Sequence, residues 1–400
     1  MKHDAKELKP RVCVVSPLYH PSLGGLGRQG QRLTEELAED GVSIFVIARR
    51  MKGMPRAEFS PKVKVYRAWS LKPYLHTFED ITLTNVLVSL SFCISCAILL
   101  IRKRKEYDIV HFHGASLPLV FNVPLLKCIG KKIIALVVSS GFGTEAGSLR
   151  GKHFGLGNLL IKILRAVDIF VAMTTEIENG LLSDGFSGAR IVRIPNFIDF
   201  NAFSPVSPEI KRKMRTAANM ESAIIVVFTG RLIKCKGVDV LLEAWTDVAK
   251  RHSDVRLFIV GDGLMKTELS ELAAQYGILQ SVVFVGFSTA VKDFLNMADI
   301  FVFPSLHEGM PSSLLEAMAC RLPVVATNIG GVTDFVKDGE NGLLAEPGDS
   351  VGLARGIDRL IENQELSEHI ANNGYETIRK SYSLDCIAQR YADLYNSMAI

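Results

Sequence analysis

The sequence predicts an α/β protein made of two domains, each a doubly wound parallel sheet. The chain has 400 residues, and at about 150 residues per domain this length favours more than one domain. Apolar residues make up 48% of the chain and charged residues 22%, a composition able to bury large cores. Short runs of valine and isoleucine recur without polar alternation, which is typical of parallel strands covered on both faces.

The first domain is expected to begin with a βαβ unit. Residues 11–16 form a Val-rich run, residues 29–40 have helical spacing, and residues 42–48 form a second apolar run. Further strands are expected wherever the same kind of run recurs, at residues 109–112, 133–138 and 169–172. These elements predict one doubly wound domain over residues 1–200.

A stretch rich in proline and turn formers follows this domain. Residues 194–199 and 204–208 resist both helix and central strand, so the linker is placed there. A second series of strands comes after it, at residues 224–229, 257–260, 282–285, 300–304 and 323–327. The second domain is therefore predicted over residues 201–382. Two such domains are expected to leave a crevice at the carboxyl ends of both sheets, where ligands bind.

The charge is unevenly distributed, although the formal net charge is only +4. Residues 1–200 hold 27 Lys or Arg against 17 Asp or Glu, whereas residues 201–400 hold 19 against 25. The basic first half suggests contact with a membrane lipid, a nucleic acid or a phosphorylated substrate. Charge alone leaves these three open.

An apolar segment at residues 86–101 is followed by the basic run from Arg102 to Lys105. The segment is shorter than the ~20 apolar residues that a membrane span needs, and it contains serines. We therefore expect a buried or interfacial helix. The basic run adds a second expectation, attachment to an anionic lipid surface, and a solvated helix end is its alternative.

The cysteines and the N-terminus both indicate a cytoplasmic protein. The seven cysteines lie mostly in apolar stretches, which predicts buried, reduced thiols without disulfides. Cys93 and Cys96 form a C-x-x-C pair, but no second pair or nearby histidine accompanies them, so core packing is preferred to a zinc or redox site. The first ten residues are polar and show no secretory signal.

The strongest candidate site follows the fourth predicted strand of the second domain. Glu308 and Glu316 stand eight residues apart in the run EGMPSSLLE. If Ser312 or Ser313 caps a helix over residues 314–319, Glu316 lies near its first turn and Glu308 in the preceding loop. The loop N–H groups and the helix N-terminus would then favour an anionic or hydroxyl-rich ligand. Glu316 could also serve only to complement the helix dipole.

A second candidate opens the second domain, at the end of its first strand. The run TGRLIKCKG contains Arg231 and Lys236. A forked guanidinium together with an ammonium group can neutralise a diphosphate and stabilise it as a leaving group. As isolated surface residues the two would carry little meaning.

The loop after the first strand is rich in glycine. Gly24 and Gly25 permit a close approach of backbone to a phosphate or a sugar. Gly25, Gly27 and Gly30 also match G-x-G-x-x-G, which makes an NAD(P)-dependent dehydrogenase a rival hypothesis. The spacing argues against this rival, because residues 17–24 separate the strand from the motif. The second strand also ends in two arginines, which lack the expected acid but would suit a 2′-phosphate.

Together these segments resemble the retaining family-4 glycosyltransferases, also called group 1 transferases, of the GT-B fold. The resemblance covers most of the chain and is most specific between Gly230 and Gly348. The matching pieces in chain order are G-R-L-x-x-x-K-G, the V-G-D-G loop at residues 260–263, the E-x7-E pair, and PVVAT at 323–327 followed by Gly330 and Gly331. The fold implies two Rossmann-like domains facing a central crevice, with a helix over about residues 383–400 packed back on the first domain.

By this resemblance the enzyme would transfer a hexose-type sugar, with retention, from a UDP- or GDP-linked donor to a glycan or lipid-linked acceptor. Arg231 and Lys236 would hold the diphosphate, Glu308 would meet the transferred sugar, and Glu316 would bind the ribose hydroxyls. Further donor contacts are expected from Gly24, Gly25, Gly230, Gly261, Gly309, Met310 and Pro311. No metal or other cofactor is implied, because the basic pair does what a divalent ion does in other transferases.

One departure from the family concerns a histidine. Members often carry histidine before glycine after a strand of the first domain, whereas here Ser140 precedes Gly141. His20, His111 and His113 are therefore further acceptor-side candidates, although a strand-end histidine can simply hydrogen-bond to backbone. No carboxylate is placed as a covalent nucleophile, so a front-face substitution is expected, with the leaving phosphate as base and Glu308 stabilising positive charge.

The expected partners are a nucleotide-sugar donor, a glycan or lipid-linked acceptor, and a membrane surface touched through Val86 to Lys105, with no nucleic acid. The expected setting is cell-envelope or exopolysaccharide synthesis at the inner face of the membrane. A nucleotide-sugar 2-epimerase is one alternative, and it would release an epimerised sugar without an acceptor. A non-catalytic donor-binding protein is another alternative. The replacement of the family histidine by Ser140 permits it, but the presence of Arg231 with Lys236 and of Glu308 with Glu316 argues against it.

Overall fold

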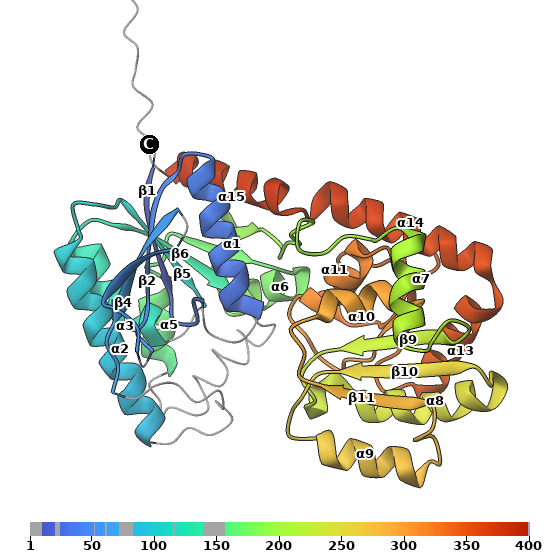
Figure 1. Cartoon of the computed structure of the whole chain (residues 1–400). Helices are drawn as coiled ribbons and strands as arrows, with labels where there is room; N and C mark the ends of the chain where they lie inside the picture. The colour runs from blue at the N-terminus through green and yellow to red at the C-terminus, as the bar shows by residue number, and fades with distance from the viewer. Residues whose placement is uncertain are drawn as a thin grey trace, which may run out of the picture. The chain divides into compact units, whose positions relative to one another are not determined.

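The computed structural model describes residues 10–20, 25–51, 53–60, 62–71, 83–114, 117–138 and 157–398. The chain divides into two compact units (Figure 1). Unit 1 consists of residues 1–195 and 384–400, and unit 2 of residues 196–383. The chain thus leaves unit 1 after Pro195, ahead of the expected boundary at residue 200, and returns to it after Ser383.

Unit 1 is built on an eight-stranded sheet in the order β3-β4-β2-β1-β5-β6-β7-β8. All neighbours pair in parallel except β3 and β4. The strands are β1 (Arg11–Ser16), β2 (Ser43–Arg49), β3 (Ala57–Ser60), β4 (Val63–Ala68), β5 (Ile109–His113), β6 (Lys132–Val137), β7 (Ile169–Ala172) and β8 (Ile191–Arg193). The prediction of a doubly wound parallel sheet is confirmed.

Six described helices accompany this sheet: α1 (Gly25–Glu39), α2 (Leu83–Arg102), α3 (Leu117–Cys128), α5 (Gly157–Leu164), α6 (Thr175–Ser183) and α15 (Leu384–Met398). Right-handed crossovers place α2 and α3 on one face of the sheet and α1 on the other, because the chain moves in opposite directions along the strand order. After its return to unit 1, α15 packs against α1.

The first helix begins earlier than expected. We predicted a helix from residue 29, but α1 begins at Gly25. Gly25, Gly27 and Gly30 therefore all lie inside the helix, and they do not form the phosphate-binding turn of a dinucleotide fingerprint. At Gly30 an added Cβ would approach the His113 ring to 3.1 Å, so this glycine serves close packing of α1 on the sheet.

Unit 2 contains a six-stranded, fully parallel sheet in the order β11-β10-β9-β12-β13-β14. Its strands are β9 (Ile224–Thr229), β10 (Val255–Val260), β11 (Val282–Gly286), β12 (Ile300–Phe303), β13 (Val324–Thr327) and β14 (Leu343–Ala345). Its helices are α7 (Pro208–Ala217), α8 (Val238–Arg251), α9 (Lys266–Gln275), α10 (Val291–Met297), α11 (Ser312–Ala319), α12 (Gly330–Thr333), α13 (Ser350–Glu362) and α14 (Gln364–Ser381). The five predicted strands are confirmed, and β14 is an addition.

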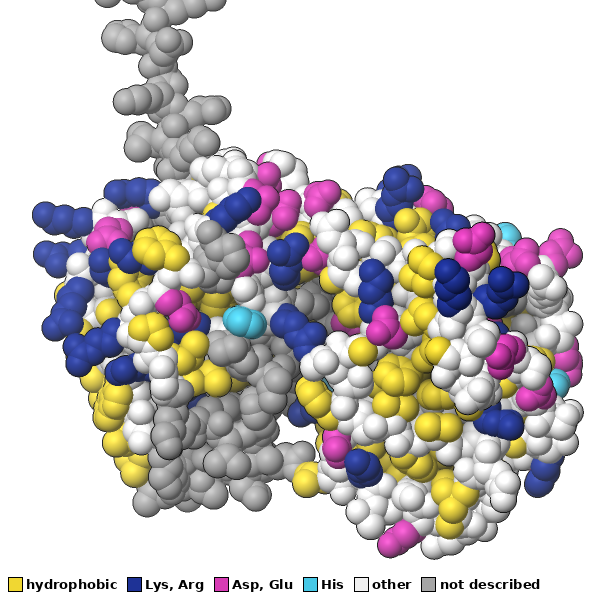
Figure 2. Space-filling view, in the orientation of Figure 1, with side chains coloured by type: hydrophobic (Ala, Val, Ile, Leu, Met, Phe, Trp, Pro, Cys, Tyr) yellow, Lys and Arg dark blue, Asp and Glu magenta, His cyan; other side chains and the backbone are white. Residues whose placement is uncertain are grey.

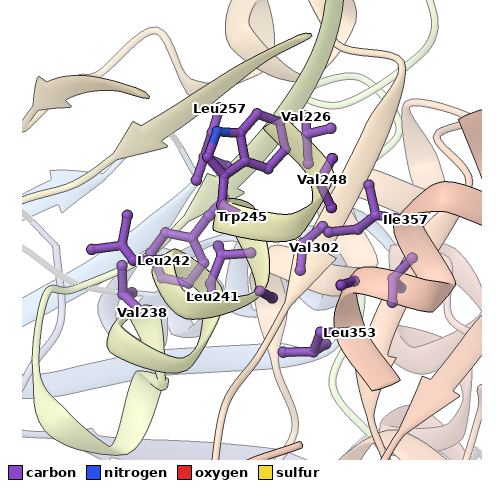
Figure 3. Packing of buried hydrophobic residues seen from close by; sticks show 14 of the residues in the cluster. Val226, Val238, Leu241, Leu242, Trp245, Val248, Leu257, Val302, Leu353 and Ile357 are labelled. Carbon is purple, nitrogen blue, oxygen red and sulfur yellow. The ribbon is translucent and has the colours of Figure 1, made fainter. Parts of the chain in front are cut away.

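The core of unit 2 lies between the sheet and helices α8 and α13. Trp245 of α8 is fully buried, in one cluster with apolar side chains from the strands and from α13 (Figure 3). Its indole N–H donates to Ser281 Oγ at 2.9 Å, so the one polar atom of this side chain is satisfied.

The cysteines are free thiols, and Cys93 and Cys96 pack inside unit 1 as expected. Burial raises the pKa of the Cys93 thiol to about 11, so it stays protonated at neutral pH. Cys128 corrects the expectation of buried thiols, because it is exposed on α3. Among the described residues no group of three or more His, Cys, Asp or Glu could hold a metal ion, and no helix suffices to cross a membrane.

Candidate active site

The two charged motifs of unit 2 meet at one edge of its sheet. Strands β9 and β12 are parallel neighbours, so the loops that follow them leave the sheet side by side. The loop after β9 carries Arg231 and Lys236, and the loop after β12 carries Glu308. The two loops are joined by a backbone hydrogen bond, in which the Leu306 N–H donates to the Cys235 carbonyl at 2.8 Å.

Gly237 allows this close approach. Its backbone is left-handed, with φ of 62°, and an added Cβ would lie 2.1 Å from the Pro304 carbonyl oxygen. No side chain fits at that distance, so glycine is required both by its conformation and by its neighbour. The last glycine of the G-R-L-x-x-x-K-G motif therefore sets the spacing of the two loops.

Lys236 and Glu308 form an ion pair between these loops. Their side chains are only 15% and 17% exposed, so the pair is largely shielded from water. Ser305 Oγ also donates to Glu308 at 3.4 Å, and the Lys236 ammonium lies 5.7 Å from the centre of the Phe303 ring. A partly buried cation and a partly buried carboxylate are thus held together at the carboxyl edge of the sheet.

Strand β13 is hydrogen-bonded to the start of the loop that carries Glu308. Thr327, at the end of β13, donates its hydroxyl to the Ser305 carbonyl at 2.5 Å. Both Thr327 and Ser305 are fully buried. This contact fixes the start of the Glu308 loop, because the carbonyl and the hydroxyl satisfy each other away from water.

The loop after β9 begins with Gly230 and Arg231, and it meets the loop after β10 at Gly261. Gly230 donates its N–H to the Val260 carbonyl at 3.0 Å. A Cβ on Gly261 would lie 1.8 Å from the Gly230 carbonyl oxygen, so the two backbones cross in contact. Arg231 itself is exposed, and within the described part of the chain no side chain pairs with it.

The N-cap of the helix after Glu308 lies one residue before the first predicted cap. We expected Ser312 or Ser313 as N-cap, but the N-cap is Pro311 and Ser312 is the first helical residue. Pro311 offers no side-chain oxygen, so the start of α11 has no side-chain cap. Glu316 is the fifth residue of α11 and is half-buried.

Met310 and Gly309 are held by neighbouring backbone. The Asn196 N–H lies 3.1 Å from Met310 Sδ, and the Asn196 side chain donates to Ser312 Oγ at 3.2 Å. A Cβ on Gly331 would lie 1.6 Å from the Gly309 carbonyl oxygen, so α12 packs directly on this loop. The loop from Glu308 to Pro311 is consequently fixed from both sides.

Sequence reasoning missed Ser305, Thr327 and Asn196 as parts of this arrangement. Each lies at or just beyond a strand end, or in the linker, where a polar residue is ordinary. The available signal was their position, because polar residues that follow strands collect at the carboxyl edge of a parallel sheet.

The histidine candidates lie in unit 1. His111 is fully buried, and its Nδ1 lies 2.7 Å from the Tyr395 hydroxyl. His113 is buried beside it, with the two rings 4.7 Å apart. Burial lowers the pKa of His113 to about 4 and that of His111 well below its ordinary value, so both are neutral at pH 7.

Of the other unit 1 candidates, the structure describes His20 and Gly25. His20 is exposed, and its carbonyl accepts a hydrogen bond of 2.6 Å from Arg67. Gly25 begins α1. Gly24 and Ser140 lie outside the described residues.

Two family models match the chain, and together they cover most of it. Residues 210–377 match the model described as "Glycosyl transferases group 1". Residues 23–202 match the model described as "Glycosyltransferase Family 4". The first match includes Lys236, Glu308 and the residues described around them, apart from Asn196.

Curated relatives agree with these models. N-acetyl-alpha-D-glucosaminyl L-malate synthase of Bacillus anthracis is 26% identical over 94% of this chain and 94% of its own length. EpsD of Bacillus subtilis, named as a glycosyltransferase, is 30% identical over 73% of this chain and 77% of its own. The lipopolysaccharide core biosynthesis glycosyltransferase LpsE of Rhizobium meliloti is 34% identical over 59% and 66%.

Solved structures with the same fold include a sucrose-phosphate synthase and a protein bound to UDP and glucose. Sucrose-phosphate synthase from Thermosynechococcus elongatus superposes with a TM-score of 0.80 at 21% identity, covering 98% of this chain and 99% of that one. Anabaena HepE in complex with UDP and glucose superposes with a TM-score of 0.75 at 20% identity, covering 97% and 100%.

Proposed function

Because the chain belongs to the group 1, family 4 glycosyltransferases and has their GT-B fold, we propose that it transfers a hexose-type sugar from a nucleotide diphosphate sugar. The proposed donor is UDP- or GDP-linked, and the proposed outcome is retention of configuration. The observation that carries this proposal is the Lys236–Glu308 pair at the carboxyl edge of the unit 2 sheet. The complex of HepE with UDP and glucose supports a nucleotide-linked donor.

Lys236 and Arg231 are assigned to the donor diphosphate. The two cations share one short loop, so both can reach adjacent phosphate groups. Charge on the leaving diphosphate grows as the glycosidic bond breaks, and fixed cations stabilise that charge without reorganising. Because this pair supplies the positive charge, we propose that the reaction needs no metal ion.

Glu308 is assigned to the transferred sugar. In the structure its carboxylate neutralises Lys236, and a bound diphosphate would compete for the same ammonium group. The freed carboxylate would then be available to orient sugar hydroxyls and to stabilise positive charge at the anomeric carbon. A front-face substitution, with the leaving phosphate as base, requires no covalent nucleophile from the protein.

The N-terminal part of α11 is assigned to the rest of the donor. Its first N–H groups have no side-chain cap, and a helix N-terminus favours a phosphate. Glu316, one turn further on, can accept hydrogen bonds from ribose hydroxyls. The backbone of Gly309, Met310 and Pro311, which joins Glu308 to the start of α11, is assigned to lining the sugar and the phosphate.

The acceptor is proposed to be a glycan or a lipid-linked glycan of the cell envelope. The similarity to LpsE, a lipopolysaccharide core enzyme, supports this class. The basic first half of the chain supports a site of action at the inner face of a membrane, where an anionic surface would attract it.

The test is acceptor-free binding and turnover with UDP-, GDP- and ADP-sugars, with NADP as a control ligand and Lys236→Ala as a matched variant. Saturable binding of one nucleotide sugar, with slow hydrolysis that the variant lacks, is the expected result. Binding of NADP alone would contradict the proposal. Release of an epimerised sugar in the absence of an acceptor would contradict a transferase and indicate a nucleotide-sugar 2-epimerase.

A further inference from the structure

Helix α2 turns a continuous apolar stripe toward solvent. Leu87, Ile94, Ile98 and Ile101 are spaced at i, i+7, i+11 and i+14, which is one face of a helix. Their exposed fractions are 48%, 53%, 44% and 41%. Single exposed apolar residues are ordinary, but four on one helix face form a patch.

The neighbouring helix extends this patch. On α3 the side chains of Leu117, Phe121, Pro124 and Cys128 are exposed, again along one face. Helices α2 and α3 pack against each other, and the crossover argument places both on the same face of the sheet. Both stripes therefore face away from the sheet, into solvent.

A third segment lies beside the stripe of α2. Trp69 and Leu71 follow β4 and are 55% and 54% exposed. Ser95 Oγ donates to the Trp69 carbonyl at 2.6 Å, and Ser91 Oγ accepts from the Leu71 N–H at 3.0 Å. Serines in an apolar helix therefore hold an exposed tryptophan and leucine next to it.

Basic side chains border the patch at the C-terminal end of α2. Arg102, Arg104 and Lys105 are exposed, and neither α2 nor α3 contains an aspartate or a glutamate. Lys103 is paired with Glu106 at 2.9 Å, and Arg104 caps the Ile101 carbonyl. Figure 2 shows the hydrophobic side chains along this edge of unit 1, with Lys and Arg side chains gathered beyond them.

We propose that this surface, the α2–α3 face, docks on an anionic phospholipid bilayer. The occupant follows from the combination of features: apolar stripes for the acyl boundary, a tryptophan suited to the interface, and exposed cations, at the end of a helix that carries no acid, for lipid phosphates. No described helix is long and apolar enough to cross a bilayer, so α2 would lie in the plane of the interface. The inference deepens the proposed function, since it supplies the surface on which a lipid-linked acceptor is met.

The experiment uses the full chain, with vesicles of phosphatidylcholine alone or with phosphatidylglycerol added. The chain has two tryptophans, and Trp245 is fully buried, so Trp69 reports on the surface. We expect co-sedimentation with the anionic vesicles, a blue shift of Trp69 emission on binding, and weaker binding at high salt. Trp69→Phe should remove the shift and keep most of the sedimentation.

Two variants test the two components separately. Ile94→Asp places a charge in the stripe, and its matched control is Leu264→Asp at a site of unit 2 that is 74% exposed. Arg102→Ser with Lys105→Ser removes two border cations, which should lower the partition coefficient about fivefold per residue. Arg212→Ser with Lys213→Ser, at exposed positions of α7, is the matched charge control.

The proposal is supported if both α2 variants lose vesicle binding while both controls keep it. It is overturned if wild-type protein ignores anionic vesicles, or if the α2 variants sediment as well as their controls. Dimers that Ile94→Asp converts to monomers, without vesicle binding, would assign the face to a second copy of the chain. Donor binding needs no vesicles and is measured on the same variants, so a failed donor assignment would be recognised independently.

Discussion

The ion pair between Lys236 and Glu308 makes the proposed role of Glu308 testable by one isosteric change. Glu308→Gln keeps the shape and removes the charge that would stabilise the sugar in the transition state. We expect kcat to fall by roughly 10²–10³-fold, as for loss of one preorganised electrostatic group. Donor affinity should hold or rise, because the Lys236 ammonium no longer has a competing carboxylate. Steady-state kinetics and titration with the donor measure the two effects.

A matched control for this substitution is Glu340→Gln, which changes an exposed glutamate paired with Lys337 elsewhere in unit 2. That variant should keep both kcat and donor affinity. A Glu308→Gln enzyme that turned over normally would remove Glu308 from the reaction.

Glu316 should affect binding more than turnover. Glu316→Ala removes the proposed hydrogen bonds to ribose hydroxyls, each of which is worth about 1.5–3 kcal/mol when a charged group takes part. We expect donor affinity to fall by roughly 10- to 100-fold, with kcat at saturating donor little changed. Equilibrium binding of the nucleotide sugar and of the free nucleoside diphosphate checks this, and equal affinity in variant and wild type would contradict it.

The lowered pKa of His113 predicts that the free energy of unfolding of unit 1 falls at acidic pH. Its pKa is about 4 in the folded protein against an ordinary value of 6.5, so the unfolded chain binds its proton first as the pH falls. The stabilising contribution is complete above pH 6.5 and is lost on the way to pH 4. The loss between pH 7 and pH 5 amounts to about 2 kcal/mol for this group. Urea unfolding at both pH values measures it.

The variant His113→Phe should show a smaller difference between the two pH values, with the remainder due to His111. The control is His369→Gln, which changes an exposed histidine of α14. If His113→Phe lost as much stability between pH 7 and pH 5 as wild type, another group would be responsible.

At the level of single residues, the charged groups of the motifs could be predicted from the sequence, but the polar residues that hold their loops in place could not. Lys236 and Glu308 each follow a predicted strand of the same parallel sheet, so the sequence predicts that both lie at its carboxyl edge. Ser305, Thr327 and Asn196 carry no periodic pattern, and their roles follow only from hydrogen bonds between distant segments. The predicted serine cap of α11 was wrong, because the chain enters the helix through Pro311.

Among the elements, buried strands were predicted well and half-exposed ones were not. Strands β1, β7 and β9 coincide with runs of valine and isoleucine, since both of their faces are covered. Strand β4 alternates buried and more exposed side chains, while β8 and β14 have three residues each. Such short or alternating segments do not stand out from loops in a sequence.

The contact between the loops after β9 and β12 gives a prediction for Gly237. Gly237→Ala must place a Cβ 2.1 Å from the Pro304 carbonyl oxygen, whereas Gly339→Ala has a similar left-handed φ of 73° with nothing within 4 Å. Both variants incur about 1–2 kcal/mol of backbone strain. Only Gly237→Ala should lose additional unfolding free energy and donor affinity, because it moves the loops that carry Lys236 and Glu308.

The comparison of these two glycine variants requires urea unfolding curves and donor titrations. Equal stability of the two variants would show that the loops separate at no cost. In that case the spacing set by Gly237 would not determine the geometry of the ion pair.

For the whole molecule, the division into two units could be predicted from length and the repeated strand pattern, but the return of the chain could not be derived from periodicity. Helix α15 is amphipathic like other surface helices, and the spacing of its apolar residues does not indicate which element it packs against. The structure shows that it packs on α1 and that Tyr395 reaches His111. A contact over 284 residues of sequence has no local signature.

Removal of α15 should therefore weaken unit 1 and spare unit 2. A chain ending at Ser383 lacks Ile387, Tyr391 and Tyr395, all buried, and a fully buried large apolar side chain contributes about 1.5–3 kcal/mol. We expect unit 1 to lose more than about 4 kcal/mol of unfolding free energy. Fluorescence of Trp69 and Trp245 follows the two units separately, in Trp245→Phe and Trp69→Phe backgrounds. A truncated chain whose Trp245 transition shifted as far as its Trp69 transition would mean that the two units unfold as one cooperative body.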